Sequence, residues 1–216
     1  MRQTEAGSGN RYGTIGQLLR FRHGIFSAIA RRNLAFNRQI SVSGPVHGQC
    51  RPPVRDLRYG IVRAAWSGCG LIAVYNALLL LGNPHPLWDV FAWGDLKGAA
   101  LFGIFGTSHR RAGRLFRQLG YTVTAVTNPS LFDACAQRAE ACLFTYWNRK
   151  GRFHKGMHTV CTRWREGALE VYNLYNNSEK IERLPSFEEW CKRGIGPVAL
   201  YCVSRNDGTA ISRSGP

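Results

Sequence analysis

The longest apolar run in the chain begins directly after Cys69. Small and apolar residues recur there at helical spacing, which predicts a buried helix over residues 69–81. Gly82 and Pro84 follow and end it. Cys69 therefore belongs to the first turn of this helix, where unpaired N–H groups and the helix dipole favour a thiolate over a thiol.

The remaining pattern divides the chain into a helical half and a strand-rich half. Helical spacing dominates before residue 120, and alternating or continuous apolar runs dominate after it. We expect an α+β fold, in which a helical half carrying the cysteine helix packs on a mainly antiparallel sheet. Further helices are expected over 86–93, 107–119, 129–138 and 186–193, and strands over 57–62, 121–126, 141–147, 156–161, 168–173 and 196–203.

The segment of residues 1–57 differs in composition from the rest and is interpreted as a basic N-terminal extension. It contains a polar tail, a basic amphipathic helix over residues 15–37 and a Gly- and Pro-rich linker over residues 43–53. Such a helix binds an anionic membrane surface or an acidic partner, resembles a transit peptide, or docks on the protein's own domain. We favour docking. Residues 58–204 are expected to form the catalytic domain, and residues 205–216 a disordered tail.

Charge and cysteine content restrict the partners and the compartment. Lys and Arg number 29 against 13 Asp and Glu, a net charge of +16. This charge suits an acidic substrate or an anionic surface, with nucleic acid the less favoured partner but not excluded. The seven cysteines form no C-x-x-C pair, and four lie in apolar segments, which indicates a reducing compartment. No signal peptide or transmembrane run is visible, so a cytoplasmic location is expected.

A His and an Asn downstream complete a possible catalytic set with Cys69. His158 opens one strand-like run, and Asn173 ends the next. A turn at residues 165–167 would place the two strands antiparallel and bring both side chains together. Nucleophile, base and orienting amide then occur in the order Cys, His, Asn. Taken singly, His158 and Asn173 are equally well explained as ordinary strand residues, and a lone cysteine is better explained as part of the core, since most cysteines are buried and inert.

These residues resemble the papain-like cysteine peptidase superfamily, and most closely the bacterial branch that processes double-glycine leader peptides of bacteriocins. The resemblance covers roughly residues 59–203 and is carried by Gly68-Cys69-Gly70, His158 and Asn173. It implies a two-part papain-like fold with the active site between the halves. It also implies a peptide or protein substrate and a thioester acyl-enzyme.

One position departs from that family. Its second oxyanion donor is usually a Gln shortly before the cysteine, where this chain has Arg63, and the nearest upstream Gln is Gln49. We consider Arg63, Ser67 and Trp66 as substitutes or as walls of the cleft.

Two further assignments remain open. Asn176 is an alternative to Asn173 as the orienting residue. A metal site at His154, His158 and Cys161 is the competing interpretation, but their spacing does not place all three on one face of a strand. We therefore expect neither metal nor cofactor.

The same three catalytic residues serve several reaction types. We expect a cysteine peptidase-like hydrolase. Acyltransferase or transglutaminase-like and deamidase activities use the same groups, and a non-catalytic basic binding module on this scaffold is the other alternative.

Overall fold

The computed structural model describes residues 13–19, 24–150 and 154–206. It has an α+β architecture with one six-stranded antiparallel sheet in the order β3-β8-β4-β5-β6-β7. The strands are β3 (Thr122–Val126), β4 (Ala141–Lys150), β5 (His154–Arg165), β6 (Ala168–Tyr172), β7 (Glu182–Leu184) and β8 (Gly196–Ser204), and β1 (Arg58–Tyr59) pairs with β2 (Val62–Arg63) in a small hairpin.

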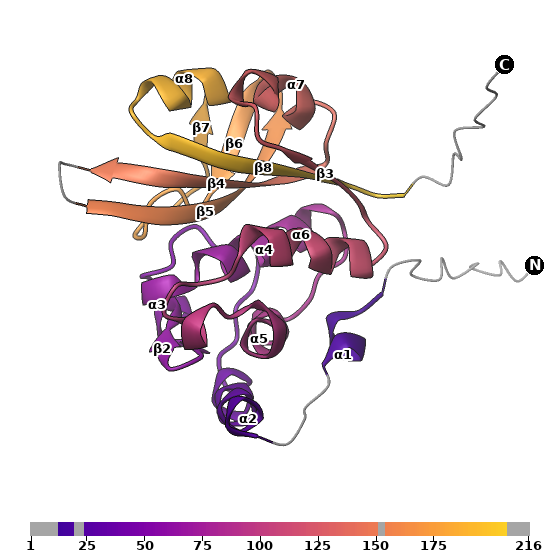
Figure 1. Ribbon diagram of the computed structural model, residues 1–216, viewed down its shortest axis with the longest axis vertical. Coiled ribbons are helices and arrows are strands. Elements are labelled where there is room, and N and C mark those ends of the chain that lie inside the picture. Colours follow the sequence, from indigo (N-terminus) through magenta and orange to yellow (C-terminus); the bar gives the residue numbers. More distant parts are fainter. Residues whose placement is uncertain (1–12, 20–23, 151–153, 207–216) are drawn as a thin grey trace, which may run out of the picture.

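The helices lie on both faces of the large sheet (Figure 1). Those that precede the sheet in sequence are α1 (Ile15–Leu18), α2 (Ile25–Asn37), η1 (Val54–Asp56), α3 (Ala64–Ser67), α4 (Cys69–Leu80), α5 (Leu87–Trp93), η2 (Gly94–Gly98), η3 (Leu101–Gly103) and α6 (His109–Gln118). On the other face lie η4 (Pro129–Leu131), α7 (Phe132–Ala136) and α8 (Phe187–Lys192). The predicted α+β class is confirmed. The cysteine helix and most later elements lie within a few residues of their expected positions, whereas β7 was not expected.

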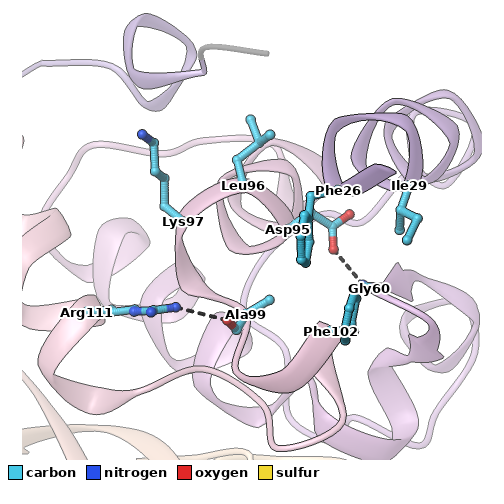
Figure 2. A pocket seen from close by; sticks show the side chains of 9 residues that line it. All are labelled: Phe26, Ile29, Gly60, Asp95, Leu96, Lys97, Ala99, Phe102 and Arg111. Carbon is cyan, nitrogen blue, oxygen red and sulfur yellow. Dashed lines mark hydrogen bonds between the residues drawn. The ribbon is translucent and has the colours of Figure 1, made fainter. Parts of the chain in front are cut away.

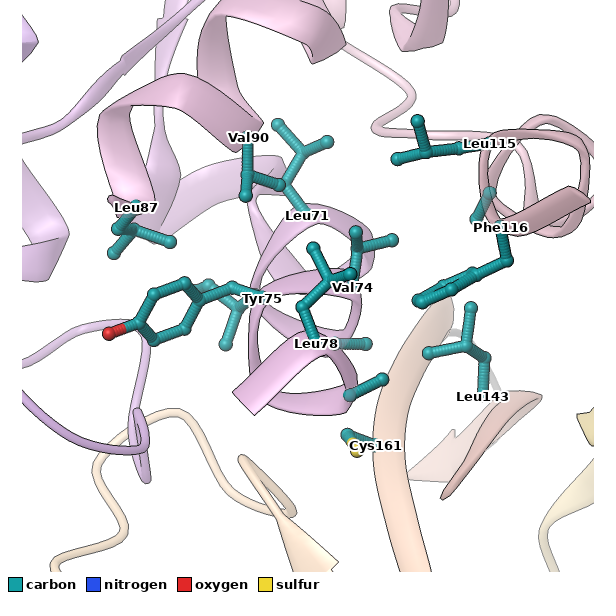
Figure 3. Close-up of a cluster of buried hydrophobic side chains, with 14 of the residues drawn as sticks. Leu71, Val74, Tyr75, Leu78, Leu87, Val90, Leu115, Phe116, Leu143 and Cys161 are labelled. Atoms are coloured by element: carbon teal, nitrogen blue, oxygen red, sulfur yellow. The ribbon is translucent and has the colours of Figure 1, made fainter. Parts of the chain in front are cut away.

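The central strands are apolar on both sides because both faces of the sheet are covered. In β4, Leu143 belongs to the core beneath the sheet and Phe144 to the core under α7 and α8. Figure 3 shows α4 at the centre of the first core, with Leu71, Val74 and Leu78 directed toward the neighbouring helices and strands. Each such side chain contributes about 1.5–3 kcal/mol by burial, so α4 is held firmly.

The basic amphipathic helix expected over residues 15–37 is divided in the structure, and polar side chains hold its second part to the domain. The expected single helix over residues 15–37 is two helices, α1 and α2, with residues 20–23 outside the described part. On α2, Ile25 and Phe26 are exposed, while Asn33 and Asn37 are buried. Asn33 Nδ2 donates to the carbonyl oxygen of Gly60 at 2.8 Å, and Asn37 Nδ2 donates to the backbone of β1 at 2.9 Å. Polar side chains therefore attach α2 to the β1–β2 hairpin.

The Gly- and Pro-rich segment expected as a linker is part of the packed domain. The backbone N–H and C=O of Val46 bond to the side chain of the buried Asn76 on α4, at 2.8 and 2.9 Å. At Gly48, a Cβ would lie 2.8 Å from the carbonyl oxygen of Asn176, so only glycine allows this approach. The segment consequently crosses the end of the sheet beside α4, with Gln49 held between the two halves. The expected tail begins at residue 205, but residues 207–216 lie outside the described part, as do residues 1–12.

Candidate active site

Cys69 is placed by a tight junction between two helices. The short helix α3 ends at Ser67, Gly68 is the one residue between the helices, and α4 starts at Cys69. A Cβ at Gly68 would lie 2.7 Å from the carbonyl oxygen of Ala64, and one at Gly70 would lie 3.1 Å from Thr107 Cβ. The glycines therefore allow dense packing around the cysteine. As the first residue of α4, Cys69 has an N–H group without an acceptor inside the helix, and its half-buried thiol lines a cleft.

His158 lies on β5 and hydrogen-bonds to Cys69. Its Nε2 lies 2.8 Å from the backbone oxygen of Asn173. A carbonyl only accepts, so Nε2 carries a hydrogen and Nδ1 is the nitrogen left for the sulfur. Tyr146, the cross-strand neighbour on β4, sets its ring edge-on to the imidazole at 5.8 Å.

The two side chains shift each other's protonation. Burial alone would raise the pKa of the Cys69 thiol, but the hydrogen bond and charge of His158, with backbone bonds at Thr159 and Gly70, bring it below its ordinary value. Burial would lower the pKa of His158, but Cys69 and the carbonyl of Asn173 raise it. Both directions favour a thiolate–imidazolium pair.

Asn173 contributes to the site through its backbone. It directly follows β6 and has a left-handed conformation with φ 63°. This turns its carbonyl toward His158, whereas its buried side chain is engaged elsewhere. Asn173 Oδ1 accepts from the backbone N–H of Gln49 at 2.9 Å, and Nδ2 donates to Gln49 Oε1 at 3.3 Å. The expected neighbourhood of His158 and Asn173 is present, with the carbonyl in contact instead of the side-chain amide.

Gln49 is a site residue that the sequence did not identify. It lines the same cleft as Cys69 and His158, although it precedes the cysteine by a long stretch of chain. Its Nε2 donates one hydrogen to the carbonyl oxygen of Ala65 at 3.1 Å, and the second has no partner among the described residues. An amide N–H is thus available in the cleft that Cys69 also lines. The only hint in the sequence was that Gln49 is the nearest Gln before Cys69.

The other candidate residues differ in whether they line the cleft of Cys69. Trp66 is exposed and lines the cleft, and Asn176 lines it further along. Ser67 is buried outside the lining, and Arg63 extends to Asp56 at 3.3 Å. Neither of these two reaches the cleft, so the geometry gives them no part in it.

The cleft is open and has a side cavity. The main space has a volume of about 530 Å³ and a polar and aromatic lining: Gln49, Trp66, Cys69, Asn148, Gly156, Met157, His158, Leu174, Tyr175, Asn176 and Asn177. A smaller cavity of about 190 Å³ shares Asn148, Leu174 and Tyr175 with it and continues to Trp190 and Arg193. An extended chain passing Cys69 would have room on this side for a large residue.

The metal interpretation gains no support from the described residues. In that part of the chain no group of three or more His, Cys, Asp or Glu side chains is arranged to hold a metal ion. Cys161 is buried in the core, and His158 faces Cys69. The side chain of His154 lies outside the described set.

Comparisons with known proteins give similar structures but no similar sequences. No family model matches the chain, and no curated protein matches it. One similar structure is a double glycine motif protease from an AMS/PCAT transporter in complex with the leader peptide, with TM-score 0.47 and 11% identity, over 78% of this chain and 96% of that one. Another is the peptidase domain of Streptococcus ComA, a bi-functional ABC transporter involved in a quorum sensing pathway, with TM-score 0.46 and 14% identity, over 74% and 97%.

Proposed function

We propose that this protein is a cysteine peptidase-like hydrolase that cleaves a peptide or protein through a thioester acyl-enzyme. The observation that carries the proposal is the hydrogen-bonded Cys69–His158 pair, whose pKa shifts favour thiolate and imidazolium, in a cleft open to solvent. A low-pKa cysteine in an accessible site is the arrangement required of a nucleophile, whereas structural cysteines are buried and inert.

In the proposed acylation step, Cys69 Sγ attacks the carbonyl carbon of the scissile amide. The oxyanion that forms accepts hydrogen bonds from the N–H of Cys69 and from the unpaired N–H of Gln49. The imidazolium of His158 gives its Nδ1 proton to the departing amine, and the C–N bond breaks. The carbonyl of Asn173 holds the ring in orientation throughout.

In the deacylation step, neutral His158 removes a proton from water, which attacks the thioester. The C–S bond breaks, the carboxylic acid leaves, and the thiolate–imidazolium pair is restored. Gln49 again donates to the oxyanion. An amine in place of water would convert the same cycle into acyl transfer.

Incubation of the protein with a mixed peptide library, followed by mass spectrometry of the products, tests the proposal. We expect new peptide termini with wild type and none with Cys69→Ala. Cys191→Ser is the matched control, because Cys191 is a half-buried thiol on α8 outside the cleft, and it should retain cleavage. Cleavage that persists in Cys69→Ala would contradict the proposal. Products that carry an added amine instead of a free carboxylate would identify an acyltransferase.

A further inference from the structure

Six exposed apolar side chains gather on the helical half, outside the cleft of Cys69. They come from three segments that are distant in sequence, and we call them the apolar face: Ile25, Phe26, Ile61, Leu101, Phe102 and Phe105. Phe26 on α2 stacks on Phe102 with ring centroids 4.9 Å apart, and the N–H of Ile61 donates to the carbonyl oxygen of Phe102 at 3.0 Å. None of the six lines the cleft of Cys69.

The backbone that displays this face is strained. Leu101 and Phe102 have φ of 46° and 57°, in the left-handed region that costs a non-glycine residue roughly 1–2 kcal/mol. Close contact with the β1–β2 turn holds them there, since a Cβ at Gly60 would lie 1.7 Å from the carbonyl oxygen of Phe102. The chain thus bears a conformational cost while it leaves large apolar side chains in water. Strain of this kind is concentrated at functional sites.

A buried network fixes α2 and the hairpin turn to η2. Asp95 on η2 accepts from the N–H of Gly60 at 2.6 Å and from Asn33 Nδ2 at 3.0 Å. Asn33 also donates to the carbonyl oxygen of Gly60. α2, the hairpin turn and η2 therefore form one platform, and the bond from Ile61 N–H to the Phe102 carbonyl joins η3 to it, so the apolar face is preformed.

Two adjoining cavities give this region an apolar part and a cationic part. The first, of about 210 Å³, lies among Phe26, Ile29 and Phe102, as Figure 2 shows. The second, of about 570 Å³, shares Lys97 and Arg111 with the first and adds Arg114. No ion pair to these three cations occurs among the described residues. Asp95 is the one acidic lining residue described, and its carboxylate is directed to Gly60 and Asn33.

We propose that the apolar face and the adjacent Lys97, Arg111 and Arg114 dock this protein on an anionic phospholipid membrane. Aromatic and aliphatic side chains beside cations that form no ion pair with the described residues suit the boundary between acyl chains and headgroups, where each apolar group and each cation adds to binding. The net charge of +16 complements an anionic surface. Nucleic acid would satisfy the cations but would leave the six apolar side chains in water. Every helix in the described ranges is too short or too polar to span a bilayer, so the contact proposed is peripheral.

Sedimentation of the full chain with vesicles tests this proposal. We expect binding to vesicles containing roughly one-third phosphatidylglycerol, weaker binding to pure phosphatidylcholine, and loss of binding at high salt. Phe26→Ser combined with Leu101→Ser should weaken binding at least tenfold, on the order of 1.4 kcal/mol. Leu131→Ser is the matched control, since Leu131 is also exposed but lies on η4, at the opposite face of the sheet.

A second variant separates docking from folding. Leu101→Gly removes an apolar side chain and also relieves the left-handed backbone at φ 46°. Its melting temperature should not fall, while its vesicle binding should. Lys97→Gln should weaken binding to anionic vesicles, whereas Lys180→Gln, at an exposed lysine between β6 and β7, should not.

Three outcomes would overturn the proposal. The first is that wild type does not sediment with anionic vesicles. The second is that the apolar-face variants bind as tightly as Leu131→Ser, which would assign binding to basic charge elsewhere. The third is that soluble glycerol 3-phosphate displaces the protein completely, which would indicate a site for small anions instead of a membrane contact. None of these outcomes bears on the peptidase proposal, which is tested with soluble peptides.

Discussion

His158 Nε2 lies 2.8 Å from the backbone oxygen of Asn173, while the side chain of Asn173 bonds to Gln49. One residue thereby serves both sides of the candidate site. Its carbonyl orients the proposed base, and its amide holds the proposed oxyanion donor. The left-handed φ of 63° at Asn173 is the conformation in which it does both.

Substitution of Asn173 distinguishes its two roles. Asn173→Gly retains the carbonyl and tolerates the positive φ, so we expect the pH profile of Cys69 labelling to stay as in wild type. The peptidase kcat should fall about tenfold, because Gln49 loses two hydrogen bonds. Asn173→Ala should show the same kinetics with about 1 kcal/mol lower stability from backbone strain. If Asn173→Gly instead shifts the labelling profile as strongly as His158→Ala does, the side chain is the orienting group.

Gln49 is predicted to act on the oxyanion alone. Gln49→Glu retains an acceptor for Asn173 Nδ2 but cannot donate, so kcat should fall by about 10²–10³ with little change in KM. Steady-state kinetics on the best library peptide would measure this. The labelling rate of Cys69 with iodoacetamide at neutral pH should fall less than threefold. A variant that retains full kcat would remove Gln49 from the mechanism.

Asp95 should make stability depend on pH. Burial raises its pKa from 3.8 to about 7, against the opposing hydrogen bonds from Gly60 and Asn33. The folded state therefore binds more protons than the unfolded state between about pH 4 and 7, and stability falls as pH rises through that window. We expect a loss on the order of 2 kcal/mol between pH 5 and 8, reduced by the partial exposure of the side chain.

The urea concentration at the midpoint of unfolding, measured between about pH 5 and 8, should fall with pH in wild type because of Asp95. Asp95→Asn should lack this contribution. Glu188→Gln, at an exposed carboxylate on α8, is the matched control and should follow wild type. Identical slopes for wild type and Asp95→Asn would refute the assignment.

Local sequence patterns predicted the helix and the pair of strands that carry the candidate site residues. The apolar run after Cys69 identified α4, and the turn at residues 165–167 set β5 beside β6, because both signals come from neighbouring residues. Gln49 could not be predicted in this way. It reaches the cleft because Val46 bonds to Asn76 and Gly48 packs on Asn176, contacts between segments far apart in the chain.

Helix α2 shows a second feature that the pattern of apolar residues does not predict. Its apolar spacing does not identify the side that packs on the domain, because Ile25 and Phe26 are exposed and the polar Asn33 and Asn37 are buried. Buried amides with complete hydrogen bonds cost little, so hydropathy alone does not show which side of α2 is buried. Ile25 and Phe26 instead belong to the exposed apolar face.

The pH dependence of Cys69 labelling by iodoacetamide tests the central claim most directly. With each modified cysteine located by mass spectrometry, Cys191 serves as a half-buried internal reference. We predict that Cys69 reacts rapidly well below the ordinary thiol pKa of about 8.5, and that His158→Ala slows this reaction at neutral pH and moves its midpoint upward. A Cys69 that reacts no faster than Cys191, or that is unaffected by His158→Ala, would contradict the thiolate–imidazolium pair and with it the proposed peptidase.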